Sequence, residues 1–340
     1  MGKYAVFIGR FQPFHNAHLR LVRAGLESAE RLIIVVGSAG GARNVKNPWS
    51  AAERIAFITA CLTEDEAARV TFVCAKDYLY GDNRWIAALQ SAVHEVAPDI
   101  NDGGTVLIGH RKDASSFYLK LFPQWTFVEA GAASDKQLDA TVVRESLFRK
   151  DTLTLRSLVP PTVHTMLTEY MATEEYKRLH EEFHHIEEYK AGWTGAPFPP
   201  TFNTVDAVVV CSGHVLLVRR RGAPGRGLLA LPGGYIEPTE GLEDACIREL
   251  KEETSIRIPP KDLRKAIERE KTFGHPNRSL RGRTITHAFC INLGDGDLPP
   301  VKGGDDADKA FWLPFREVNM REDQFFDDHF HILQYFVSRF

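Results

Sequence analysis

Three glutamates in the second half of the sequence could bind a metal ion. Glu249, Glu252 and Glu253 follow a stretch with few helix breakers that starts near Gly241, so the sequence predicts a helix there. Residues at i, i+3 and i+4 share one face of a helix, where three carboxylates repel one another. A hard divalent cation relieves that repulsion, and Mg²⁺ is usually held by carboxylates together with substrate phosphates. The alternative is a solvated acidic face without a ligand.

Two histidines near the N-terminus form a second candidate. His15 and His18 come just after a short apolar run that ends at Gly9, at the predicted entry to a helix. Side chains at the N-terminus of a helix can face an anion, because the backbone N–H groups and the helix dipole favour negative charge there. Two histidines at this spacing are also often incidental, so their surroundings decide their meaning.

The elements around these histidines predict an open parallel sheet. Apolar runs predict strands at residues 3–9, 31–37, 70–75 and 105–109, with helices at 18–30, 53–62 and 85–96 between them. Continuous apolar runs are typical of parallel strands that are buried on both faces. Ligands bind such sheets at the carboxyl ends of the strands, which is where the histidines follow Gly9.

A second domain follows a segment rich in breakers. We predict one domain over residues 1–191, a linker over 192–201 and a second domain over 202–340. In the second domain, Ser212-Gly213 predicts a hairpin between strands at 206–211 and 214–219. Further strands are predicted at 285–291 and 310–313, and a final amphipathic helix at 323–340.

Length and composition narrow the class of protein. The 340 residues suffice for two domains with full cores, and 44% hydrophobic with 26% charged residues is ordinary for a globular protein. A net charge of -3 gives no reason to expect nucleic-acid binding driven by bulk charge. No apolar run approaches the roughly 20 residues that span a bilayer, and no signal peptide is evident. The five cysteines are far apart, which favours thiols in a reducing cytoplasm.

Residues 234–256, GYIEPTEGLEDACIRELKEETSI, resemble the signature box of Nudix hydrolases. The resemblance implies a mixed-sheet α/β/α sandwich that hydrolyses a nucleoside diphosphate joined to another group. It implies Glu249, Glu252 and Glu253 as ligands of Mg²⁺, or of Mn²⁺ in its place, with Glu252 as ligand or catalytic base. One position departs from the family: Ser255 stands where a glycine normally ends the helix in a left-handed turn.

Residues beyond the box resemble the ADP-ribose pyrophosphatases among these hydrolases. They are the basic loop around Arg278 and Arg283, the run Gly-Gly-Asp-Asp-Ala at 303–307, and Trp312. The resemblance implies that the two arginines bind ADP-ribose. The catalytic base is open, since the aspartates of 303–307 could supply it or could form an acidic surface turn.

Residues 9–18, GRFQPFHNAH, resemble the GRFQPFHxGH motif of nucleotidylyltransferases, and in detail the archaeal type of nicotinamide-nucleotide adenylyltransferase. Ala17 replaces the family's second glycine. The resemblance implies a Rossmann-like fold and adenylyl transfer from ATP to nicotinamide mononucleotide, giving NAD and pyrophosphate. In this motif it implies site roles for Gly9, Arg10, Phe11, His15 and His18.

Later segments resemble the same family in the same order. Those implied to contact nucleotide are Lys46, Asn47 and Trp49, then Asp77, Asn83 and Trp85 in DYLYGDNRW, then Lys112, and finally Thr141 and Arg144 in DATVVR. In the family, the tryptophan stacks on the pyridine ring and the last arginine reaches the triphosphate. Three alternatives stay open: Trp85 as a core anchor, Lys112 in an exposed basic loop, and Thr141 as an ordinary N-cap.

Together the two resemblances cover nearly the whole sequence. The sequence as a whole resembles the bacterial fusions of these two enzymes. They imply ATP, nicotinamide mononucleotide and ADP-ribose as small-molecule partners, with neither nucleic acid nor membrane. Homo-oligomers are common in both families, so the oligomeric state is open. Two rivals are kept: nicotinate mononucleotide or another phosphate monoester as the acceptor, and a second domain that senses nucleotides. The presence of all three box glutamates favours a hydrolase over a sensor.

Overall fold

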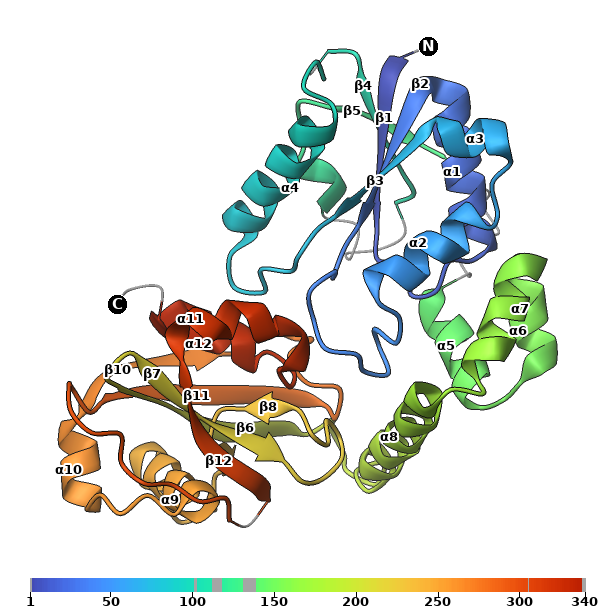
Figure 1. Ribbon diagram of the computed structural model, residues 1–340. Coiled ribbons are helices and arrows are strands. Elements are labelled where there is room, and N and C mark those ends of the chain that lie inside the picture. Colours follow the sequence, from blue (N-terminus) through green and yellow to red (C-terminus); the bar gives the residue numbers. More distant parts are fainter. Residues whose placement is uncertain (1, 101–102, 112–117, 131–138, 305, 338–340) are drawn as a thin grey trace. The chain divides into compact units, whose positions relative to one another are not determined.

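The computed structural model describes residues 2–100, 103–111, 118–130, 139–304 and 306–337 (Figure 1). The chain divides into two compact units, Met1–His180 and Glu181–Phe340. This division falls within helix α8 (Glu174–Ala191), so one helix contributes residues to both units. The domain bounds expected from the sequence, with a linker at 192–201, stay a prediction.

The first unit is built on a five-stranded parallel sheet (Figure 1). Its strands are β1 (Gly2–Gly9), β2 (Ala29–Val36), β3 (Val70–Cys74), β4 (Thr105–Gly109) and β5 (Thr126–Glu129). They lie in the order β3-β2-β1-β4-β5, and every neighbouring pair is parallel. The central strands β1 and β2 are buried along most of their length, as their apolar runs predict. The Rossmann-like fold is confirmed.

Helices connect these strands and close the unit. They are α1 (Asn16–Ser28), α2 (Ala51–Thr59), α3 (Glu64–Ala68), α4 (Asp82–Val96), α5 (Ala140–Phe148), α6 (Thr152–Leu158) and α7 (Pro161–Tyr170), followed by α8. The first helix begins earlier than predicted and ends at Ser28, because residues 29 and 30 already belong to β2. At α2, Ser50 and Glu53 exchange side-chain to backbone hydrogen bonds in a capping box, which fixes where this helix starts.

The second unit contains a mixed sheet (Figure 1). Its strands are β6 (Thr201–Cys211), β7 (His214–Arg220), β8 (Leu229–Ala230), β9 (Gly233–Tyr235), β10 (Ile267–Phe273), β11 (Arg283–Asn292) and β12 (Ala307–Pro314). The main order is β10-β11-β6-β7-β12; β11 and β6 are parallel, and the other neighbours are antiparallel. The predicted hairpin is present, with positive φ at both Ser212 (44°) and Gly213 (71°), as a tight hairpin turn requires.

Helices cover the two faces of this sheet. They are α9 (Leu242–Thr254), α10 (Pro260–Lys265), α11 (Phe315–Val318), the 3₁₀ helix η3 (Asn319–Gln324) and α12 (His329–Val337). From α9, Cys246 and Leu250 pack in one core with Val205 and Val209 of β6. The α/β/α sandwich is therefore confirmed.

The prediction of one continuous helix over 323–340 is wrong within the described part. Phe325 is extended and Asp327 has a φ of 43°, so the chain turns there before α12 starts at His329. Residues 338–340 lie outside the described residues. None of the helices in the described ranges combines the length and the apolar character that crossing a bilayer requires.

Candidate functional site

The first candidate site lies at the carboxyl end of β1 and the start of α1. Gly9 ends the strand, and a Cβ added there would stand 2.7 Å from the ring of Phe11. Phe11 has a φ of 52° and is buried, so its ring folds back under the strand end. Only glycine leaves room for that ring, which explains the residue type at position 9.

His15 and His18 lie together, as their spacing predicts. His15 is the N-cap of α1 and is 5% exposed. The two imidazole rings stack with centroids 3.6 Å apart and an interplanar angle of 20°. The His15 backbone N–H donates to His18 Nδ1 at 3.4 Å, which assigns the proton of a neutral His18 ring to Nε2. The Nε2–H of His18 can donate to a phosphate oxygen.

Three cations lie close to one another, and one of them is bonded to the segment that carries the histidines. Arg144 of α5 donates to the backbone oxygen of Gln12 at 2.6 Å, which brings it to the GRFQPFH segment. Burial and the nearby charges of Arg10 and Arg144 lower the pKa of Lys46 to about 8. Burial, together with Arg10, also lowers the pKa of Arg144 to about 10. Asp77 acts in the opposite direction on Lys46, but positive charge dominates, so this region favours an anion.

Thr141 does not cap the helix, contrary to one interpretation of the sequence. Asp139 is the N-cap of α5, and its Oδ1 accepts the Thr141 backbone N–H at 2.7 Å. Because Asp139 is the residue that caps the helix, Thr141 lies two residues later, in the first turn of α5. Its hydroxyl instead accepts a hydrogen bond from Arg144 Nη2 at 3.1 Å.

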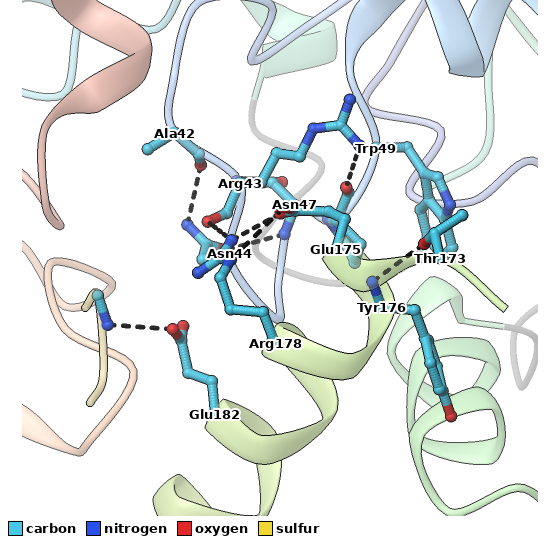
Figure 2. A network of polar contacts seen from close by, with 12 residues as sticks. Ala42, Arg43, Asn44, Asn47, Trp49, Thr173, Glu175, Tyr176, Arg178 and Glu182 are labelled. Carbon is cyan, nitrogen blue, oxygen red and sulfur yellow. Dashed lines mark hydrogen bonds and ion pairs between the residues drawn. The ribbon is translucent and has the colours of Figure 1, made fainter. Parts of the chain in front are cut away.

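Polar contacts shape the loop that carries Lys46, Asn47 and Trp49. Asn44 Oδ1 accepts the backbone N–H groups of both Lys46 and Asn47 at 2.9 Å. Figure 2 shows this loop beside α8, where Arg178 donates to the Arg43 backbone oxygen at 3.2 Å. The Asn44 side chain and Arg178 of α8 therefore hold the backbone of the loop that carries Lys46.

Trp49 belongs to the core of the first unit. Its side chain is 2% exposed, and its ring lies 5.7 Å from Phe57 and 5.4 Å from Tyr170 between centroids. Its backbone N–H donates to Gln12 Oε1 at 3.1 Å, and its oxygen accepts from Gln12 Nε2 at 2.8 Å. Trp49 thus ties its loop to the GRFQPFH segment, and its predicted contact with nucleotide stays a prediction.

Arg54 is a residue to which the sequence analysis assigned no role in the site. It is 1% exposed, and its guanidinium donates to the backbone oxygens of Arg10 (2.6 Å), Gly37 (2.6 Å), Ser38 (3.2 Å) and Ser50 (3.1 Å). It therefore joins the ends of β1 and β2 to the start of α2. The signal was present in the sequence: Arg54 shares a helix face with the apolar Phe57 and Ile58, which predicts a buried arginine.

The predicted nicotinamide segment spans a loop and the start of α4. Asp77 and Asn83 are exposed, and Asp77 is close enough to Lys46 to raise its pKa. Trp85 is half-buried, and its ring meets Phe122 edge-on at 5.9 Å. This position is compatible both with a core anchor and with a ring that stacks on a ligand. The predicted Lys112 lies outside the described residues.

The second candidate site lies on α9 and the β9 turn. Glu253 is 7% exposed, and its Oε2 accepts the Gly233 backbone N–H at 3.0 Å. A Cβ on Gly234 would stand 2.4 Å from Glu249 Oε1, so glycine lets this backbone approach the carboxylate. Burial and the charge of Glu249 raise the pKa of Glu253 to about 8, against the effect of the Gly233 N–H. The carboxyl group of Glu253 is therefore harder to ionise than that of a free glutamate.

Arg248 lies among the acidic side chains of the box. It donates to Glu249 at 2.8 Å, to Glu252 at 2.9 Å and to Glu240 at 2.6 Å, and also to the Tyr235 backbone oxygen. Within the described ranges, no three His, Cys, Asp or Glu side chains form a group arranged for a metal ion. The donors still fit a hard divalent ion by their chemistry, because Glu249, Glu252 and Glu253 supply carboxylate oxygens from one helix.

The two predicted basic residues beyond the box have protein partners. Arg278 is 6% exposed and forms a bidentate pair with Asp328 at 2.9 and 3.0 Å. Arg283 donates to the Gly274 backbone oxygen at 2.9 Å. Their contact with ADP-ribose stays a prediction. In the 303–307 loop, the Gly304 N–H donates to the Glu253 backbone oxygen at 3.1 Å, and Asp305 lies outside the described residues.

Comparison with known proteins identifies the two halves separately. Residues 6–119 match the cytidylyltransferase-like family and residues 200–336 match the NUDIX domain family. The chain is 38% identical over 180 residues to the nicotinamide/nicotinic acid mononucleotide adenylyltransferase of Acinetobacter baylyi, covering 53% of this chain and 93% of that protein. It is 36% identical over 106 residues to the ADP-ribose pyrophosphatase of Methanocaldococcus jannaschii, covering 31% of this chain and 57% of that protein.

A solved structure matches both halves at once. It is a bifunctional NMN adenylyltransferase/ADP ribose pyrophosphatase from Francisella tularensis, complexed with AMP and a manganese ion. The identity is 32% with a TM-score of 0.91, over 100% of this chain and 99% of that chain. Fold and sites define a nucleotidyltransferase-like domain joined to a NUDIX domain. The chain belongs to the family of bifunctional NMN adenylyltransferase/ADP-ribose pyrophosphatases.

Proposed function

We propose that the first unit transfers the adenylyl group of ATP to nicotinamide mononucleotide, giving NAD and pyrophosphate. One observation carries this proposal: Arg10, Lys46 and Arg144 concentrate positive charge beside the stacked His15 and His18. A triphosphate supplies the negative charge that this cluster lacks. Similarity along the whole chain to the Francisella protein supports the same activity.

The reaction needs positioning more than covalent chemistry from the protein. A phosphate oxygen of the mononucleotide attacks the α-phosphorus of ATP, and the bond to the bridging oxygen breaks as pyrophosphate leaves with its electron pair. Enzymes accelerate such transfers by alignment and by neutralising charge. The His18 Nε2–H would donate to a reacting phosphate, while Arg10 and Arg144 would offset the charge on the leaving pyrophosphate.

Nicotinamide mononucleotide is the proposed acceptor because of the segment that carries Asp77, Asn83 and Trp85. Nicotinate mononucleotide is the second candidate, since the name of the Acinetobacter relative includes both the nicotinamide and the nicotinic acid mononucleotide. The two acceptors differ by a carboxylate in place of an amide.

For the second unit, we propose hydrolysis of ADP-ribose to AMP and ribose 5-phosphate. Glu249, Glu252 and Glu253 would hold Mg²⁺, or Mn²⁺ in its place. When bound, such an ion activates water and neutralises the diphosphate. The Gly233 N–H fixes the Glu253 carboxylate, and Arg248 orients Glu249 and Glu252. A purely sensing role is not favoured, because the full-length relative is itself named as a pyrophosphatase.

A product assay tests both activities. The purified chain, Mg²⁺ and ATP are mixed with equal amounts of nicotinamide and nicotinate mononucleotides, and products are identified by mass spectrometry. We expect NAD and pyrophosphate to dominate. In a second tube, ADP-ribose should give AMP and ribose 5-phosphate. A dominant acid dinucleotide would overturn the choice of acceptor, and intact ADP-ribose would overturn the hydrolase.

A further inference from the structure

The turn from Leu231 to Gly233 is held by hydrogen bonds at each of its three residues. The Leu231 backbone N–H donates to His329 Nδ1 at 3.0 Å, and the Pro232 oxygen accepts a backbone N–H of β6 at 2.8 Å. The Gly233 N–H donates to Glu253 Oε2 at 3.0 Å. A carboxylate of the second site is therefore connected through this turn to His329, the first residue of α12.

The turn packs tightly against β6. A Cβ added to Gly233 would stand 2.1 Å from the Val205 backbone oxygen and 2.8 Å from Asp206 Oδ1, so the glycine backbone lies directly on that strand. Gly233 and Asp206 also face each other in the ladder between β6 and β9. Because close-packed interiors transmit small displacements, a shift of the turn at Leu231 also shifts the Gly233 N–H.

The His329 ring is suited to accept a hydrogen bond. Its Nδ1 accepts the Leu231 N–H, so the proton of the neutral ring is on Nε2. The side chain is buried, and burial lowers the pKa of His329 to about 3, against the effect of Asp328. The imidazole therefore stays neutral near pH 7 and keeps its acceptor.

A buried ion pair fixes the start of α12. Arg278 donates two hydrogen bonds to Asp328, at 2.9 and 3.0 Å, and both side chains are buried. Arg278 also lies 3.8 Å from Asp206 Oδ2, which accepts the Thr286 hydroxyl at 2.6 Å. Asp328 directly precedes His329, so this pair holds the end of the helix, and with it the imidazole, close to β6.

We propose that His329 is a positioning residue of the hydrolase: it holds the turn from Leu231 to Gly233 and thereby fixes the Glu253 carboxylate for the metal ion. The inference rests on the proposed hydrolase function. The hydrogen bond joins residues 98 positions apart, so only the fold shows it. Groups that orient a metal ligand from behind typically contribute about tenfold to a hundredfold to metal affinity.

Three substitutions separate the hydrogen bond from the bulk of the ring. His329→Asn keeps an acceptor, Oδ1, at the same number of bonds from Cα as Nδ1. His329→Gln moves the acceptor one bond further along the side chain, and His329→Leu removes it. His331→Leu is the control, since His331 is half-buried two residues later on the same helix.

The first measurement is Mn²⁺ binding to the full chain by electron paramagnetic resonance, without nucleotide. Mn²⁺ that still binds to the Glu253→Gln protein belongs to other sites and is subtracted. We expect His329→Leu and His329→Gln to weaken Mn²⁺ about tenfold or more, and His329→Asn and His331→Leu to stay within about threefold of the unaltered chain. In hydrolysis, His329→Leu should raise the Mg²⁺ concentration at half-maximal rate more than it lowers the rate at saturating Mg²⁺.

Hydrogen exchange of the backbone amides reports on the turn itself. The Gly233 amide should exchange faster in His329→Leu than in His329→Asn or His331→Leu, because the turn then opens more easily. This amide is the decisive one, since its own acceptor, Glu253, is unchanged in all these variants. Circular dichroism checks that each variant folds.

If His329→Leu does not fold, the comparison of His329→Asn with His329→Gln decides. Equal Mn²⁺ affinity in those two variants, or Mn²⁺ binding by His329→Leu as tight as by His331→Leu, would contradict the inference. Hydrolysis of ADP-ribose by the unaltered chain is measured separately. Its absence would overturn the proposed activity, whereas the Mn²⁺ and exchange measurements would still decide the role of His329.

Discussion

At the scale of single residues, the adenylyl-transfer site is defined by charges that the protein leaves unbalanced. Lys46 is a clear case, since burial and two arginines hold its pKa at about 8 while Asp77 compensates only in part. A free lysine has a pKa near 10.4, so the ammonium form is less favoured here than in a free lysine, and a bound anion would stabilise it. Binding and protonation are therefore linked.

We predict that ATP binding raises the pKa of Lys46 and takes up protons just above pH 8. The affinity for ATP should fall as the pH rises through 8, because the free protein then loses the ammonium charge. Lys46→Met should bind ATP on the order of tenfold more weakly below that pH and show no such proton uptake. Calorimetry in two buffers of different ionisation enthalpy measures the protons.

The exposed Lys261 on α10 gives a control for this measurement. Lys261→Met should keep the proton uptake and the pH dependence of the unaltered chain. The same uptake in Lys46→Met would show that another group titrates, and the assignment of the triphosphate to this cluster would lose its support.

At the scale of elements, α9 ends in a left-handed turn at a residue that is not glycine. Ser255 is the C-cap and has a φ of 51° and a ψ of 26°. A side chain in this conformation is strained by about 1 kcal/mol relative to glycine. The departure from the family pattern therefore leaves the turn unchanged and lowers only its stability.

Ser255→Gly should accordingly stabilise the second unit by roughly 0.5 to 1 kcal/mol, because glycine adopts positive φ without steric cost. Urea unfolding followed by tryptophan fluorescence measures the change in unfolding free energy. Ser255→Ala serves as the comparison, since alanine keeps the Cβ and should give no such gain. A destabilised glycine variant would mean that the serine side chain contributes more than the strain costs.

A second prediction concerns how Arg54 joins β1, β2 and α2. Arg54→Met leaves buried backbone oxygens without donors, so we expect a loss of about 3 kcal/mol in unfolding free energy. It should also lower kcat/KM for adenylyl transfer on the order of a hundredfold, because the GRFQPFH segment shifts. Arg54→Lys should restore part of both losses.

Arg69 provides the matched control for this experiment. It too donates to backbone oxygens, those of Glu30 and Ala29 among them, but it lies at the amino end of β3, whereas Arg54 lies at the carboxyl ends of β1 and β2. Arg69→Met should therefore lose stability without a comparable loss of kcat/KM in the folded fraction. Equal kinetic defects in both variants would show that Arg54 acts through stability alone.

At the scale of the whole molecule, the two candidate sites are built from separate sets of residues. The first uses the ends of parallel strands in Met1–His180, and the second uses α9 and β9 in Glu181–Phe340. Neither set of catalytic candidates includes a residue from the other unit. Substitutions that share no interaction partners have additive effects.

We predict that one substitution removes one activity alone. His18→Ala should abolish NAD formation and leave ADP-ribose hydrolysis within about twofold, and Glu253→Gln should do the reverse with a loss on the order of a hundredfold or more. Both assays are run on each variant and on the double variant. If His18→Ala also slowed hydrolysis strongly, the sites would be coupled.

Local sequence determined much of this protein. Apolar runs predicted four of the parallel strands, and residue order in GRFQPFHNAH and in the 234–256 box pointed to both chemistries. These patterns can be recognised without the tertiary structure, because they depend on residues that are close together in the sequence. The stacking of His15 on His18 and the common face of the box glutamates follow from spacing along a helix.

Only the tertiary structure decided which polar groups are already occupied. In the sequence, Arg278 belongs to a basic loop. In the structure, its guanidinium forms a buried ion pair with Asp328, 50 positions later. Arg54 reaches carbonyl oxygens up to 44 positions away, and Arg220 meets Arg281 on Phe326. These contacts depend on how strands and helices pack, because a charge's partner is set by distance in space, and separation along the chain does not encode that distance.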